Sequence, residues 1–159
     1  MLFTPRPKGL GSENFLKLND KQEVTGIFQG GIYTFRRHWL NNRGSECPGE
    51  GCQICAADPE KNYPSFRFRV NFITTKDGKW VAKIFEGGGE TYDILTNLDR
   101  KFDLTKTVVE IGRSGLKQNT KYNVIPLTNY PITKEMDAMI KAVTLLALSS
   151  EEVEPGAEG

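Results

Sequence analysis

The only histidine of the chain and all three of its cysteines lie within eighteen residues, from His38 to Cys55. They follow the spacing H-x8-C-x4-C-x2-C, with the cysteines at Cys47, Cys52 and Cys55. One imidazole and three thiolates complete the ligand set of a closed tetrahedral zinc site. Such a site would force the end of one element and the loop after it to fold onto each other. We therefore expect a structural Zn²⁺ site formed by these four residues.

The same four residues allow other interpretations. Free thiols, or one disulfide with a cysteine left over, are the simplest alternatives, but an odd cysteine count argues against a disulfide framework. A zinc deaminase needs an H-x-E and a P-C-x-x-C motif, whereas Leu40 stands two residues after His38 and Gly51 precedes Cys52. A site with four protein ligands has no open position for substrate. Because the carboxylates elsewhere show no paired spacing, we expect a protein that is not an enzyme.

The clearest strand of the sequence is YPSFRFRVNFITT, residues 63–75. Large apolar side chains alternate there with Arg67, Arg69 and Asn71, which predicts a core-facing side and a basic side. Asp77-Gly78 predicts a tight hairpin turn, with a partner strand over residues 79–85.

The remaining elements predict a mainly β domain. Strand, strand, strand, helix, strand, strand is the order of a five-stranded oligonucleotide/oligosaccharide-binding (OB-fold) barrel, and the helix disfavours the rival SH3-like barrel. We expect residues 1–132 to form this domain, with a zinc subdomain at 36–58 in the loop between strands 1 and 2. The other predicted elements are a long strand at 21–39 bent at Gly30-Gly31, a helix at 90–102 between strands 3 and 4, strands at 107–112 and 121–127, a C-terminal helix at 133–149 that starts at an N-cap Thr133, and a disordered acidic tail at 150–159.

The net charge of +1 conceals an asymmetry. The last ten residues hold four glutamates and no base, which leaves 21 basic and 16 acidic residues, a net +5, in the rest of the chain. This pattern fits a polyanion ligand and an acidic competitor for it, and it equally fits an ordinary solvated surface with a frayed end. No signal-peptide h-region and no apolar run of membrane-spanning length occur, so we expect a cytoplasmic protein.

Aromatic and basic side chains alternate on the predicted strands, as suits a single nucleic-acid strand. Basic groups neutralise phosphates, and rings stack on exposed bases. Several of these rings could instead be core, and Trp39 could simply shield the zinc site. The candidate nucleic-acid-binding residues are Tyr33, Phe35, Arg37, Trp39, Arg67, Arg69, Trp80, Lys83, Arg113, Lys117 and Lys121.

The cluster after a strand ending in YTFRRHW, the strand SFRFRVNF and the acidic tail together resemble the single-stranded DNA-binding proteins of bacteriophages. The resemblance is to the zinc-containing, helix-destabilising type, and its arrangement extends over about residues 15–127. It implies an OB-fold with zinc held by the histidine and the three cysteines. It also implies a protein that coats single-stranded DNA without sequence specificity, during phage replication, recombination and repair in the cytoplasm of the infected bacterial host cell.

The resemblance further implies an acidic C-terminus that recruits replication and recombination proteins and competes for the DNA groove. The basic N-terminal arm that such proteins use for cooperative coating has no clear match, so self-association on DNA stays an open expectation. The alternative function is a zinc-stabilised replication adaptor that acts mainly through protein contacts of the tail. The tail residues concerned are Glu151, Glu152, Glu154 and Glu158.

Overall fold

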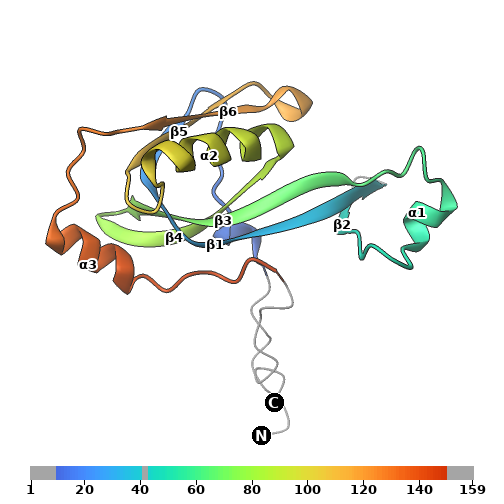
Figure 1. The fold of residues 1–159 in the computed structure, drawn as a ribbon, viewed down its shortest axis with the longest axis horizontal. Coiled ribbons are helices and arrows are strands. Elements are labelled where there is room, and N and C mark those ends of the chain that lie inside the picture. The colour runs from blue at the N-terminus through green and yellow to red at the C-terminus, as the bar shows by residue number, and fades with distance from the viewer. Residues whose placement is uncertain (1–9, 41–42, 150–159) are drawn as a thin grey trace, which may run out of the picture.

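The computed structural model describes residues 10–40 and 43–149, and this part of the chain forms an open, antiparallel six-stranded sheet with three α-helices (Figure 1). The path through the sheet is β4-β3-β1-β5-β6, and β2 pairs with the end of β1. The strands are β1 (Glu23–Leu40), β2 (Arg43–Glu46), β3 (Ser65–Lys76), β4 (Lys79–Gly88), β5 (Val109–Ser114) and β6 (Lys121–Pro126). The helices are α1 (Gln53–Ala57), α2 (Gly89–Phe102) and α3 (Lys134–Ala142), with short 3-10 turns η1 (Ser12–Asn14) and η2 (Lys117–Asn119).

The long strand β1 is bent at its two central glycines, as predicted. Gln29 pairs with Asn71 and Ile32 with Val70, so Gly30 and Gly31 have no partner on β3. Gly30 adopts φ +79°, a left-handed conformation that favours glycine. Two extra residues complete one period of side-chain alternation. Each face of β1 therefore keeps its identity across the bend.

The β3–β4 hairpin also follows the sequence prediction. Asp77 and Gly78 form its two-residue turn with φ of 53° and 78°, the positive values that such a hairpin turn requires. The turn sets the register from Lys76 opposite Lys79 to Arg67 opposite Gly88. β4 continues past its predicted end, and α2 starts directly at Gly89.

The apolar side chains of β3 form the centre of the core. Phe68 and Phe72 are fully buried, and they pack with side chains of β1, β4, β5 and β6 inside the curved sheet. Helix α2 covers this core with Leu95 and Tyr92, and the Tyr92 ring lies 5.6 Å from that of Phe68. The opposite side of the sheet carries a second apolar cluster, in which Ile140 of α3 packs on two isoleucines of β1 and β3.

The sheet is not closed into a barrel. The strands β4 and β6 lie at its two edges and share no backbone pairing, although the rings of Phe85 and Tyr122 meet at 5.1 Å. The N-terminal segment takes part of the free edge of β4, because Phe15 forms a parallel bridge with Ile84 and the Leu16 N–H donates to the Ile84 carbonyl (2.8 Å). The predicted closure into a barrel is therefore not observed. The predicted order of strands and helix along the chain is observed.

The C-terminal helix is shorter than predicted. Thr133 caps it, with its hydroxyl accepting from the Met136 N–H (3.1 Å) as expected, but α3 ends at Ala142 and the chain continues without helix to Ser149. The Leu146 N–H donates to the Asn71 side-chain oxygen (2.8 Å), and the Asn71 amide donates back to the Leu146 carbonyl (3.0 Å). This tertiary contact replaces the intrahelical bonds that the sequence pattern predicted.

We expect Asn71→Ala to release this segment, since the substitution leaves both backbone groups of Leu146 without their partner. Unfolding free energy should fall by about 1–2 kcal/mol, as for a lost pair of partly buried hydrogen bonds. Hydrogen exchange at the Leu146 amide should accelerate with it. Thr75→Ala, at an exposed site on the same strand, serves as the control, and unchanged exchange at Leu146 in Asn71→Ala would contradict the assigned contact.

Candidate functional site

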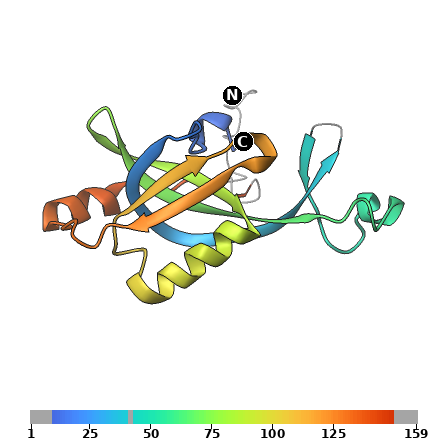
Figure 2. The ribbon, with the colours of Figure 1, turned by 90° about the horizontal axis from the view of Figure 1, so that it is seen from above.

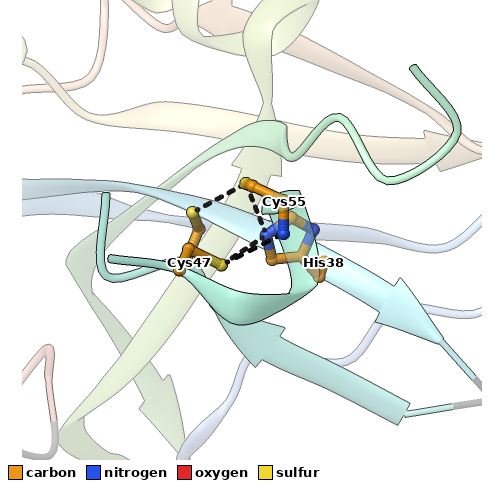
Figure 3. Close-up of side chains that lie close together, drawn as sticks. His38, Cys47 and Cys55 are labelled. Carbon is orange, nitrogen blue, oxygen red and sulfur yellow. Dashed lines mark hydrogen bonds between the residues drawn. The ribbon is translucent and has the colours of Figure 1, made fainter. Parts of the chain in front are cut away.

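The end of β1 and the loop after it bring the histidine and the three cysteines together. His38 lies opposite Ser45 of β2 and is only 2% exposed. The Cys47 N–H donates to the carbonyl of Arg36 (2.7 Å), which holds the start of the loop beside β1. Figure 3 shows the imidazole and the sulfurs converging from these segments. In Figure 1 the resulting lobe lies at the far end of the β1–β3 ladder from α3.

Backbone turns place the other two sulfurs. Gly49 and Gly51 adopt φ of +86° and +76°, conformations that ordinary side chains rarely permit. Cys52 then caps the short helix α1, where its sulfur accepts from the Cys55 N–H at 3.5 Å. The two-residue spacing therefore turns both thiols toward His38.

The distances within the cluster fit a four-ligand ion. His38 Nε2 lies 3.4 Å from Cys52 Sγ and 3.3 Å from Cys55 Sγ, and Cys47 Sγ lies 3.6 Å from Cys55 Sγ. All four ligand atoms lie within 4.8 Å of one another. Zinc–ligand bonds of about 2.0–2.3 Å in a tetrahedron separate neighbouring ligand atoms by about 3.6–3.8 Å. The cluster is thus a possible metal site of nearly the right size.

The electrostatics of the sulfurs also favour a cation. The Cys55 N–H bond to Cys52 outweighs burial and lowers the pKa of Cys52 to about 6, so that this thiol is ionised at neutral pH. Burial, hydrogen bonding to the other two sulfurs and their negative charge raise the pKa of Cys55 to about 11. A second thiolate in this space is costly without a positive ion, and a divalent metal removes that cost.

We expect Cys55→Ser to lower both metal content and stability, because a structural metal contributes directly to folding. Bound metal, measured by elemental analysis of the purified protein, should fall well below one equivalent. The melting temperature should drop by about 5 °C or more, as the loss of a few kcal/mol implies for a chain of this size. Ser45→Ala, which changes an exposed β2 residue beside His38, should leave both values unchanged, and equal metal content in the two variants would refute the site.

Beside the metal cluster, six of the predicted nucleic-acid-binding residues share one face of the sheet. Tyr33 pairs with Arg69 across the β1–β3 ladder, and Phe35 pairs with Arg67. The next residues outward on the same side of β1 are Arg37 and Trp39. This set is named here the arginine–aromatic face: Tyr33, Phe35, Arg37, Trp39, Arg67 and Arg69.

Rings and guanidinium groups stack throughout this face. Phe35 is buried and lies between the Tyr33 ring, 5.4 Å away and nearly parallel, and the Arg69 guanidinium at 4.3 Å. Arg37 covers one side of the Trp39 ring at 5.5 Å, while Trp39 as a whole is 62% exposed. Phe35 therefore holds its neighbours in place by packing, whereas the exposed Trp39 ring can contact a ligand.

One carboxylate organises the three arginines. Glu86 of β4 accepts from Arg37 (3.0 Å), Arg67 (2.9 Å) and Arg69 (2.8 Å). Glu46 of β2 adds a contact to Arg69 at 3.3 Å and accepts from the Tyr33 hydroxyl at 2.8 Å. Three guanidinium groups against two carboxylates leave the cluster with a net positive charge.

These contacts shift two pKa values. Burial by itself raises the pKa of Glu86, but hydrogen bonds from Arg67 and Arg69 outweigh it, so the pKa lies below the ordinary 4.5. Burial, and then the charge of Arg67, lower the pKa of Arg37 below its ordinary value, with Glu86 acting in the opposite direction. The carboxylate thus keeps three like charges together on one surface.

The other predicted binding residues lie elsewhere. Trp80 is on the same side of the sheet as the arginine–aromatic face but at the opposite end, partly buried in the apolar cluster beneath α3. Lys83 faces the other side of the sheet, where it donates to the Glu13 carbonyl (2.7 Å). Arg113 donates to the carbonyl of Leu18 and to the hydroxyl of Thr120. Two exposed lysines, Lys117 and Lys121, flank the β5–β6 connection. The four tail glutamates, Glu151, Glu152, Glu154 and Glu158, lie outside the described residues.

The sequence interpretation missed Glu86. A two-residue turn at Asp77-Gly78 fixes the strand register and places residue 86 opposite Arg69, as observed. The pairing of Glu86 with Arg69 could therefore have been predicted from the hairpin. It also missed Glu46 and Asn71, whose partners come from parts of the chain that local patterns do not connect.

Comparisons with protein-family models, curated proteins and solved structures gave no match to this chain. Within residues 10–40 and 43–149, no helix is long and apolar enough to cross a membrane.

We expect Glu86→Gln to destabilise the protein by about 3 kcal/mol at pH 7, since it leaves three partly buried arginines without their shared charge partner. A carboxyl whose pKa is lower in the folded state than in the unfolded state stabilises the fold at pH values above the unfolded-state pKa. This contribution is lost as the pH falls through the folded-state pKa. The difference from wild type, measured by urea unfolding, should therefore shrink below pH 4.5.

The control for this prediction is Glu60→Gln, at an exposed loop position, which should match wild type at every pH. A constant difference between Glu86→Gln and wild type from pH 7 to pH 3 would contradict the charged role of Glu86.

Proposed function

We propose that this protein is a single-stranded DNA-binding protein that coats the strand without sequence specificity and carries a structural zinc ion. The observation that carries the proposal is the arginine–aromatic face, in which rings and guanidinium groups interleave over the β1–β3 ladder. Cationic groups on such a surface neutralise phosphates and release their counterions, and aromatic rings stack on bases. Duplex DNA hides its base faces, so this surface favours single strands.

The strand arrangement supports an OB-type fold for this function. Ignoring β2, the sheet order β4-β3-β1-β5-β6 and a helix between β4 and β5 match a five-stranded barrel of that kind, which is often partly open. Such barrels bind oligonucleotides on their second and third strands, here β3 and β4, and on the loops after the first and fourth strands. The metal lobe and the β5–β6 connection occupy those two loop positions.

Zinc is the ion that the donor set favours, because one imidazole and three thiolates in a closed tetrahedron are typical of structural zinc. His38, Cys47, Cys52 and Cys55 would hold it. In this role the ion fixes the end of β1, and with it the positions of Arg37 and Trp39 on either side of His38.

The biological setting rests on the sequence resemblance. On that resemblance we propose a role in coating single strands during phage replication, recombination and repair, with the acidic tail as a partner-binding segment. The described part of the chain ends close to the arginine–aromatic face, since the Leu148 carbonyl accepts from Arg69 (3.0 Å).

The fluorescence of Trp39 tests the proposal. In Trp80→Phe, the only remaining tryptophan lies on the arginine–aromatic face. We expect a single-stranded oligonucleotide to quench it strongly and the corresponding duplex to quench it weakly, because stacking needs an exposed base. Raising salt should weaken binding with a log–log slope of about −0.7 per phosphate contacted.

Trp39→Phe is the matched control, since it retains only Trp80 beneath α3 and should show little response to either nucleic acid. Equal quenching of Trp39 by single strand and duplex, or no response together with no gel shift, would rule the proposed function out.

A further inference from the structure

A groove of about 520 Å³ lies where the arginine–aromatic face meets the metal lobe. This volume falls within the range of about 300–1,000 Å³ typical of ligand sites. β4 ends opposite Arg67 while β3 continues outward, so the edge of β3 is uncovered there. In Figure 2 the start of α2 faces this end of the sheet. The lining residues that matter below are Arg36, Arg37, Trp39, Tyr63 and Arg67.

Two arginine–aromatic pairs line this one groove. Arg37 lies over the Trp39 ring at 5.5 Å, and Arg36 lies over the Tyr63 ring at 5.8 Å. Trp39 is 62% exposed and Tyr63 is 71% exposed, the largest exposed fractions among the aromatic side chains of the described residues. In each pair a guanidinium covers part of the ring, and most of the ring surface remains open to solvent.

The groove is also set up for a negative charge. Its lining includes three arginines and no carboxylate. Arg36 forms no ion pair within the described residues, and the buried Nε of Arg67 has no hydrogen-bond partner there. The exposed Arg36 is therefore available where a phosphate could approach, and Arg67, whose side chain is 24% exposed, lines the same groove.

Gly44 on β2 allows one of the two pairs to form. A Cβ at Gly44 would lie 2.9 Å from Arg37 Cδ and 3.2 Å from the Trp39 ring. A larger residue at this position would therefore require the Arg37 side chain and the Trp39 ring to shift.

We infer that this groove binds two nucleotides of a single-stranded nucleic acid, with bases stacked on Trp39 and Tyr63 and their phosphates held by Arg36 and Arg67. The inference rests on the proposed function and extends it, because it assigns Tyr63 and Arg36 as binding residues. Rings on two different segments give the strand a path from the arginine–aromatic face onto the metal lobe.

The test compares Tyr63→Leu with wild type by fluorescence anisotropy, using labelled oligothymidylate and the same oligonucleotide made abasic. A lost stack should weaken oligothymidylate binding about fivefold or more and leave abasic binding unchanged. Tyr63→Phe, which keeps the ring, should restore wild-type affinity, and Tyr130→Leu, at another exposed tyrosine, should have no effect. Oligouridylate of equal length shows whether RNA is bound by the same stack.

Arg36→Gln provides the second measurement. Losing one phosphate contact should reduce the salt slope by about 0.7, whereas Tyr63→Leu should leave the slope unchanged. If wild type binds oligothymidylate and Tyr63→Leu binds it equally well, the inference is wrong while the proposed function stands. The inference also fails if Tyr63→Leu weakens the binding of normal and abasic strands alike. If wild type binds no single strand, the inference and the proposed function fail together.

Discussion

The antiparallel pairing of β1 with β3 is the constraint on which the rest of the structure depends. One side of this ladder buries the phenylalanines of β3, and the other carries the arginine–aromatic face. His38 lies one residue beyond its outer end, where β1 pairs with β2, so the ladder determines where the histidine and the three cysteines meet. The unpaired Gly30 and Gly31 bend the ladder without exchanging its faces, because two residues are one period of a strand. The core, the arginine–aromatic face and the cluster of His38 with the three cysteines therefore all depend on this pairing, and a slip by one residue would disrupt all three.

Glu86 gives the arginine–aromatic face its particular electrostatic character. Without it, Arg37, Arg67 and Arg69 would repel one another and lose order. With it, they stay close together, and the net charge remains positive because three guanidinium groups face the two carboxylates of Glu86 and Glu46. In the proposed function, a phosphate would meet groups that are already oriented, which would lower the entropic cost of binding. The same carboxylate would compete with the phosphate for those donors and so limit the affinity.

Several features could be predicted from sequence because their causes are local. Alternation defined β3, Asp77-Gly78 defined the hairpin, Thr133 defined a helix start, and the spacing of Cys52 and Cys55 predicted the metal cluster. Barrel closure and the length of α3 could not be predicted in this way. Phe15 reaches the β4 edge from far along the sequence, and Asn71 captures Leu146 across 75 positions. The helical spacing of apolar residues beyond Ala142 contains no information about the contact between Asn71 and Leu146.

The sequence by itself determined which residue types alternate, where the chain turns and which four side chains can bind one ion, because these depend on neighbours within a few positions. Only the tertiary structure decided which of the candidate side chains share a surface. It placed Trp80 beneath α3 and Lys83 on the opposite side of the sheet, and it grouped Arg36, Trp39, Tyr63 and Arg67 around one groove. The physical reason is that strand pairing and helix docking join segments far apart in the chain, and local pattern contains no record of which segments will meet.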